Sequence, residues 1–175
     1  MNDLAGLILL LAVAAAMVAL AAVLLWWLDP SQQVARALAM KLGGAPDARL
    51  IAAGRWQGVA IRFDAATIAV VRGRGDDGLI YDLDELVGIE LLFDHAVAAR
   101  MFRGEGRKAL DQTAPAVTRV ALRLVFDDVR DPDMEILLHT PEDETHRQGR
   151  SAADAVGEAR QWLTRIEAVL RRPVR

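Results

Sequence analysis

The order of apolar and polar residues divides this 175-residue chain into two unlike parts. Residues 4–28 form an unbroken apolar run that contains no charged residue and no proline. As an α-helix the run would be about 37 Å long, which exceeds the roughly 30 Å of a hydrocarbon core. In lipid a backbone must satisfy its own polar groups, and within one short segment only a helix does so. The run therefore predicts a transmembrane anchor at residues 1–28.

The residues that flank the run indicate its position and direction. Trp26 and Trp27 stand at its C-terminal edge, so we expect them at the membrane interface, where indole rings are enriched. Residues 1–3 contain no basic side chain, whereas Arg36 and Lys41 follow the run. The positive-inside rule then predicts a single-pass protein of the cell inner membrane, with its N-terminus outside and its C-terminal domain in the cytoplasm. A cleaved signal peptide is the alternative, but the run is long for one and lacks a basic start.

Small residues follow one side of the predicted anchor. Ala12, Ala15, Ala16 and Ala19 fall at spacings that place them on a common face. Such small residues let two transmembrane helices approach closely, which makes this a candidate helix–helix face. The alternative is that the alanines face lipid.

A short amphipathic segment follows the anchor. Asp29 and Pro30 are typical of a helix start, and apolar residues recur at every fourth position from Val34 to Leu42. The sequence GGAPD then indicates a linker. We expect residues 29–48 to form a juxtamembrane helix and linker. The helix either lies on the bilayer surface, or is a stalk or packs on the domain that follows.

From residue 49 onward the pattern changes to a period of two, which indicates β-strands. The stretch 95–115 has no clean period, and we expect a long excursion there that is partly helical at 96–102. About seven strands are predicted in all. They cover residues 50–53, 58–64, 67–72, 79–83, 87–94, 120–126 and 134–138.

The last predicted element is an amphipathic helix at residues 151–172. Ser151 followed by Asp154 is typical of a capping box, and Arg171 and Arg172 complement the helix dipole at the other end. Its apolar stripe consists of Val156, Ala159, Leu163, Ile166 and Leu170, widened by Trp162 and Val169. Strands followed by one helix indicate an α+β domain over residues 49–175. We expect a bent antiparallel sheet, or partly open barrel, that this helix caps.

The pattern of these elements resembles a known superfold. The segments LDELVGIELLFD, LRLVFDDVRDPDMEILLH and AVGEARQWLTRIEAVL, with Asp131–Asp133 as the turn and Trp162 on the helix, resemble bacterial membrane-anchored proteins with a pleckstrin-homology-like (PH-like) domain. The resemblance covers residues 49–171 and implies a fold rather than an activity, since the function of that group is poorly defined. Eukaryotic PH domains that bind inositol lipids carry a basic cluster between their first two strands. This chain has Arg55 alone in that loop, which disfavours inositol-lipid recognition.

The composition offers little for catalysis or for nucleic acid. The chain has no cysteine, its only serines are Ser31 and Ser151, and its net charge is −3. The chain therefore offers few residues for a catalytic nucleophile beside a general base. It also has no excess of Lys and Arg that would favour a nucleic-acid partner. The histidines have no metal-ligand spacing, and the acidic residues at 127–133 lack the calcium-loop pattern, so a solvated turn is favoured. We expect a non-enzymatic protein with no metal and no cofactor.

One segment, residues 100–108, is rich in basic side chains. Arg100, Arg103, Arg107 and Lys108 lie close together in the sequence, with Phe102 among them. Near an anionic membrane each such charge contributes about 1 kcal/mol of attraction. The segment is therefore a candidate anionic-lipid contact. The alternative is a solvated loop whose basic residues pair with nearby acids.

Together these features predict a membrane protein that presents a cytoplasmic PH-like interaction or scaffold module, as a subunit of a membrane assembly. The alternative is a lipid- or small-ligand-sensing domain at the membrane surface. The expected partners are the bilayer, other membrane proteins, or a second copy of the chain through an unpaired edge strand at residues 79–83.

Overall fold

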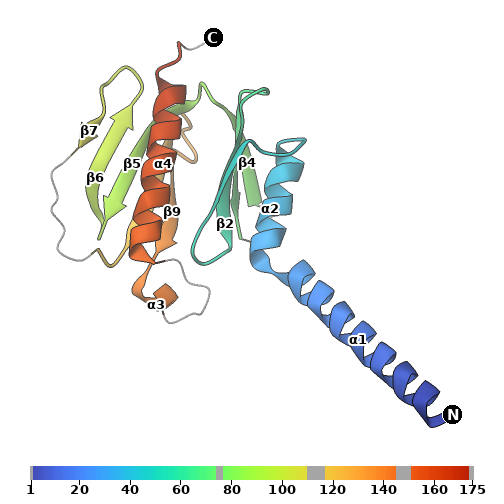
Figure 1. Cartoon of the computed structure of the whole chain (residues 1–175). Helices are drawn as coiled ribbons and strands as arrows, with labels where there is room; N and C mark the ends of the chain where they lie inside the picture. The colour runs from blue at the N-terminus through green and yellow to red at the C-terminus, as the bar shows by residue number, and fades with distance from the viewer. Residues whose placement is uncertain (1, 74–76, 110–116, 145–150, 174–175) are drawn as a thin grey trace.

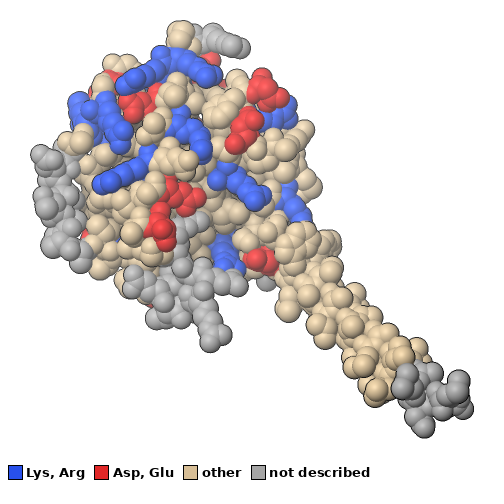
Figure 2. Space-filling view, in the orientation of Figure 1, with Lys and Arg blue, Asp and Glu red and all other residues tan. Residues whose placement is uncertain are grey.

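The computed structural model describes residues 2–73, 77–109, 117–144 and 151–173. It shows an α+β protein in which one apolar N-terminal helix projects from a domain of two antiparallel sheets and a C-terminal helix (Figure 1). Figure 2 shows that the acidic and basic residues visible in that view lie on the domain and around its junction with the helix.

The first helix, α1 (Asn2–Leu28), confirms the predicted apolar helix. Its residues 6–28 are long and apolar enough to cross a membrane, and none of that span is buried inside the structure. An N-terminal signal sequence can pass the same test of length and hydropathy.

The second helix, α2 (Pro30–Lys41), packs on the domain, which was one of the alternatives left open by the sequence. Asp29 caps it, because its carboxylate accepts a hydrogen bond from the Ser31 amide at 3.0 Å. Its apolar side chains form a cluster with residues on the outer face of the first sheet. That cluster consists of Val34, Ala37, Leu38, Leu42, Ala60, Ala69 and Val71.

The first sheet has four antiparallel strands in the order β1-β2-β3-β4. They are β1 (Ala48–Ile51), β2 (Gln57–Arg62), β3 (Thr67–Arg72) and β4 (Asp77–Asp82). The four central residues of β2 and of β3 are all buried, because α2 covers one face of the sheet and the main core covers the other.

The second sheet has five antiparallel strands in the order β7-β6-β5-β8-β9. They are β5 (Leu86–Phe93), β6 (Ala96–Phe102), β7 (Lys108–Ala109), β8 (Val120–Phe126) and β9 (Asp133–His139). Within the described ranges the strands thus form two separate sheets, and neither closes into a barrel. The expectation of one bent sheet of about seven strands is corrected to this arrangement.

The expectation of helical structure at 96–102 was wrong, because this segment is strand β6. Asp94 and His95 both have positive φ, at 48° and 73°, which is the geometry of a two-residue hairpin turn. The turn folds β6 back on β5, and Met101 pairs with Ile89. Sheet pairing outweighs the helix propensity of an alanine-rich segment, which is a weak local preference.

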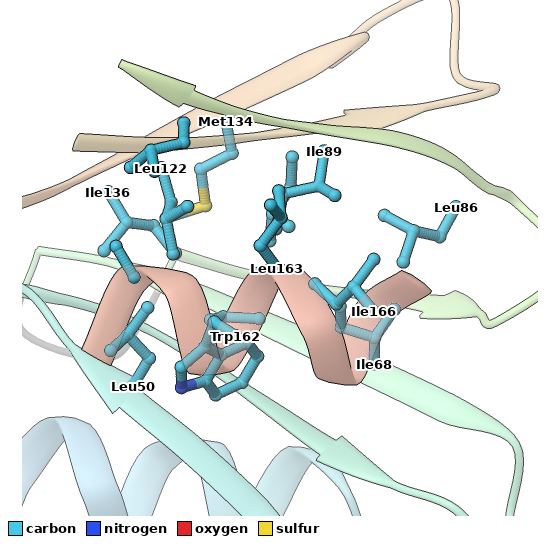
Figure 3. Close-up of a cluster of buried hydrophobic side chains, with 14 of the residues drawn as sticks. Leu50, Ile68, Leu86, Ile89, Leu122, Met134, Ile136, Trp162, Leu163 and Ile166 are labelled. Atoms are coloured by element: carbon cyan, nitrogen blue, oxygen red, sulfur yellow. The ribbon is translucent and has the colours of Figure 1, made fainter. Parts of the chain in front are cut away.

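The last long helix, α4 (Ala152–Leu170), confirms the predicted C-terminal helix and its cap. The Ser151 hydroxyl accepts a hydrogen bond from the Asp154 amide at 3.2 Å. A short helix, α3 (Pro141–Glu144), precedes it. Figure 3 shows Trp162, Leu163 and Ile166 of α4 among core side chains of both sheets. The helix therefore closes the space between the sheets.

Candidate functional site

The junction between α1 and α2 gathers aromatic and charged side chains at the end of the apolar helix. Trp26 and Trp27 are 57% and 60% exposed. The Arg36 guanidinium carbon of α2 lies 5.3 Å from the Trp26 ring centroid and 5.2 Å from that of Trp27. Both distances are within the range of cation–π attraction. The predicted interface tryptophans are thus held beside a cation of the domain.

The turn between β1 and β2 reaches the same junction. An Arg55 guanidinium nitrogen lies 3.6 Å from a carboxylate oxygen of Asp29. The Ser31 amide hydrogen bond, helped by the Arg55 charge, holds the pKa of Asp29 below its ordinary value although burial opposes this. Arg55 has a φ of 60°, a left-handed conformation that favours glycine. Trp56 follows it and is 41% exposed.

The predicted basic segment forms the β6–β7 hairpin, which lies on the opposite side of the domain from α1 (Figure 1). Arg103 contacts backbone groups: its guanidinium donates to the carbonyl oxygens of Leu83 at 2.8 Å, Leu86 at 3.0 Å and Arg172 at 3.1 Å. It joins the β4–β5 corner to the end of α4.

The other members of the basic segment also have neighbours within the domain. Arg107 pairs with Glu167 at 3.6 Å, and Lys108 donates to Glu105 at 2.7 Å. The Lys108 contact lowers the pKa of Glu105. Phe102 lies over Gly88, and the half-buried Arg100 stands opposite Glu90 on the neighbouring strand. Lipid contact by this segment stays a prediction.

The candidate helix–helix face lies on the exposed surface of α1. Ala12, Ala15, Ala16 and Ala19 are all exposed in the single chain. They are therefore accessible to lipid or to another helix, and the choice between these stays a prediction.

The strand expected at the sheet edge, β4, is the last strand of the first sheet. Two charged side chains bond its backbone. The Lys41 ammonium of α2 donates to the Gly78 carbonyl at 3.1 Å, and the Asp82 amide donates to the Glu85 carboxylate at 2.6 Å. Between them Ile80 is 50% exposed.

An open hollow of about 400 Å³ adjoins the same strand. Its lining includes Val70, Leu79 and the ion pair of Arg72 with Asp131, whose charged atoms are 3.0 Å apart. Another, of about 550 Å³, lies between the β6–β7 hairpin and the end of α4. Neither hollow is enclosed, and both mix apolar and charged side chains.

The acidic turn between β8 and β9 is held by hydrogen bonds. Asp128 accepts from the Arg130 amide at 2.8 Å and from the Tyr81 hydroxyl at 3.1 Å. Across the described residues, no group of three or more histidine or acidic side chains is arranged to hold a metal ion. His139 is buried at the end of β9, and His146 lies outside the described residues.

Comparison with known proteins finds no matching family model, no matching curated protein and no matching solved structure. The residues of the junction and of the β4 edge therefore carry the functional argument. Sequence reasoning used Arg36 and Lys41 only as charges near the anchor and did not find their contacts. The Arg36 contacts depend on the angle between α1 and α2, and the Lys41 contact joins residues 37 positions apart, so no local pattern signals them.

Proposed function

We propose that this protein is a non-enzymatic, single-pass inner-membrane protein that presents its domain at the membrane surface as an interaction or scaffold module. One observation carries the proposal. The exposed apolar helix α1 is followed, after Asp29 alone, by α2, whose apolar side chains are buried against the first sheet. A membrane helix joined in this way holds the domain close to the bilayer. A module that must meet other membrane proteins needs such a position.

The direction of the anchor is part of the proposal. Arg36 and Lys41 follow the apolar run, and residues 1–3 carry no basic side chain. This asymmetry supports a cytoplasmic domain. A phosphatase fused after Arg175 should be inactive if the domain is cytoplasmic, and active fusion protein in the periplasm would contradict the proposed topology.

We also propose that the domain is PH-like. Antiparallel sheets of four and five strands with a C-terminal helix between them support this, and so does the buried Trp162 on that helix. Among the described residues, the strands beyond the predicted seven are β6 and β7, which extend the second sheet on one side of β5.

The anchor is tested on the full chain with a C-terminal tag. Membranes are washed with alkaline carbonate, and the intact mass of the retained protein is measured. We expect the protein to stay in the membrane with residues 1–28 present. A mature chain that begins after the apolar run would show a cleaved signal sequence and overturn the proposal. Co-purification from detergent would then identify the partners of the anchored form.

A second candidate function, lipid sensing at the membrane surface, is favoured by the geometry of the junction. If α1 spans the bilayer, Asp29 lies in the headgroup region because the apolar run ends at Leu28. Arg55 lies within 3.6 Å of it, so Arg55 and the adjacent Trp56 would share that region. The cations Arg36 and Arg55 would then face the headgroups, where each basic side chain contributes about 1 kcal/mol with anionic lipid.

Single-tryptophan variants of the full chain test this second candidate. The chain has four tryptophans, so three are replaced by Phe in each variant. Trp56 should be quenched by headgroup-labelled lipid, and Trp162, which is 1% exposed, is the internal control. The variant Arg55→Gly should weaken the preference for anionic vesicles without loss of stability, because glycine suits a φ of 60°. Equal quenching of Trp56 and Trp162 would rule out the lipid contact while leaving the anchor intact.

A further inference from the structure

The hydrogen bonds of β4 show which of its backbone groups point away from the first sheet. The Leu83 amide donates to the Ala66 carbonyl at 2.8 Å, toward β3, whereas the Asp82 amide donates to Glu85. Peptide groups of a strand alternate in direction. The N–H and C=O groups of Gly78, Ile80 and Asp82 therefore point away from β3. These are the groups with which a further strand would pair.

Two charged side chains, Lys41 and Glu85, bond part of this edge, and we call them the charged caps. The Lys41 ammonium donates to the Gly78 carbonyl, and the Glu85 carboxylate accepts from the Asp82 amide. Among the described residues, no hydrogen bond is made to the Ile80 amide or carbonyl, at the centre, on their open side. Charged side chains at a sheet edge exclude strands that do not complement them. The charged caps thus restrict the edge to a partner strand that brings opposite charges to these two positions.

A second copy of the chain has matching charges. In an antiparallel pair of β4 strands centred on Ile80, Gly78 of each copy stands opposite Asp82 of the other. The basic end of one edge, with Lys41, then meets the acidic end of the other, with Asp82 and Glu85. Such a two-fold arrangement is self-complementary. When the caps leave the backbone, Lys41 of each copy can pair with Glu85 of the other.

Apolar side chains reinforce the centre of this arrangement. Ile80 is on the outer face of the sheet, beside Ala69, and is 50% exposed. Met40 of α2 is 77% exposed. Pairing would bring the two Ile80 side chains together at the two-fold axis, removing apolar surface from water.

The direction in which α1 projects is compatible with such a pair of chains in one membrane. The two-fold axis of two antiparallel strands is perpendicular to their sheet. Figure 1 shows that α2 covers the outer face of the first sheet and that α1 projects further on the same side. A rotation about the perpendicular axis keeps both α1 helices on that side. Two copies joined at β4 can therefore enter one membrane.

We propose that two copies of this protein associate in the membrane through antiparallel pairing of their β4 edges, centred on Ile80 and selected by Lys41 and Glu85. The proposal rests on the proposed function, because the anchors confine both copies to one surface and raise their effective concentration.

The chain contains no cysteine, so a single introduced thiol reports the pairing. In a hydrogen-bonded antiparallel pair the opposing Cα atoms are about 5.5 Å apart, which suits a disulfide. The full-length Ile80→Cys variant in membranes should oxidise to a covalent dimer at least about tenfold faster than Val129→Cys, which is 101% exposed. Leu79→Cys, which faces Tyr81 of the other copy in this register, should also be slow.

Charge reversal tests the selection. In the Ile80→Cys background, Lys41→Glu or Glu85→Lys alone should slow cross-linking about two- to fivefold, and the double reversal should restore it. Equal rates for Ile80→Cys and Val129→Cys, or cross-linking of Ile80→Cys to a different polypeptide, would overturn the proposal. Emission from the buried Trp162, read with the other three tryptophans replaced by Phe, verifies that each variant is folded. A monomer band at the full-length mass with no cross-linked dimer refutes the β4 pairing and leaves the anchor in place. A band shortened by loss of the N-terminal helix refutes the anchor.

Discussion

The two sheets present opposite kinds of outer face. On the first sheet the outer side chains include Ala60, Ala69 and Val71, which are buried beneath α2. On the second sheet Glu90 stands opposite both Arg100 and Arg123 on the neighbouring strands. The difference teaches how the domain is joined to the apolar helix α1. A sheet that is apolar on both faces must be covered twice, and α2, the helix next to α1, supplies the second cover.

The charged face of the second sheet is organised across its strands. Arg123 donates to Glu90 at 3.1 Å and lies 3.5 Å from Glu135 on β9. Glu90 is 9% exposed, so its carboxylate depends on this neighbour. The second sheet thus satisfies its outer face with ion pairs and needs no covering helix.

The largest expected effect comes from removing the cover of the first sheet. Leu38→Ala should lower the free energy of unfolding by about 2–5 kcal/mol, because Leu38 is fully buried between α2 and the sheet. Urea unfolding of the full chain in detergent measures it. Met40→Ala, on the same helix but 77% exposed, is the matched control and should change stability by about 0.5 kcal/mol or less. Similar losses in both variants would mean that α2 is not an essential cover.

A matched pair of glycines compares the two faces directly. A Cβ at Gly58 would lie 2.9 Å from both the Leu50 carbonyl oxygen and a Val34 methyl group. The nearest atoms to a Cβ at Gly88 would belong to the ring of the half-buried Phe102, the closest at 2.5 Å. Gly58→Ala should therefore cost about 1–3 kcal/mol of stability, because backbone and a buried helix cannot yield. Gly88→Ala should cost less, because the Phe102 ring can rotate toward solvent. A larger loss of stability for Gly88→Ala than for Gly58→Ala in urea unfolding would contradict this comparison of the two outer faces.

A smaller effect is expected from the ion pairs of the second sheet. Glu90→Gln and Arg123→Met should each destabilise the protein, and the double variant should lose less than the sum. We expect a coupling of about 1 kcal/mol from this double-mutant cycle, because each single change leaves a partly buried charge without its partner. The coupling should weaken little in high salt, since Glu90 is mostly shielded from solvent. Strict additivity would show that the pair contributes no stability.

The smallest effect at neutral pH concerns Tyr81, which joins the two sheets. Its ring stacks on Phe126 at 4.2 Å between centroids, and its hydroxyl donates to Asp128. Burial, with the hydrogen bond to Asp128 and that residue's charge, raises the pKa of Tyr81 to about 12. The folded state thus favours the neutral phenol. This stabilisation is complete below pH 10 and is lost as the pH rises from about 10 to about 12.

Tyr81 is the only tyrosine of the chain, so phenolate absorbance titrates it alone. Asp128→Asn should move the midpoint toward 10, because it removes the nearby negative charge. Phe126→Leu, which keeps Asp128, is the control. A wild-type midpoint near 10 would show that the phenol is not held between the sheets.

The sequence predicted much of the local structure and little of the site. The apolar run, the strand periods and the Ser151 cap are local signals, and the structure confirms the elements that they indicate. Strand β6 escaped detection because its hairpin turn uses Asp94 and His95, where glycine or asparagine would have been a recognisable signal. The basic segment was found as a cluster, yet its Arg103 contacts three carbonyl groups from two other parts of the chain, the β4–β5 corner and the end of α4.

By itself, then, the sequence determined most of the helices and strands, though not β6, β7 or α3, and which helix is apolar enough to span a membrane. The tertiary structure decided that α2 covers the first sheet, that Arg55 reaches Asp29, and that Lys41 and Glu85 cap β4. The physical reason is the range of the interactions. Periodicity and capping act over a few residues and leave a pattern in the chain, whereas sheet order and register set which distant side chains meet.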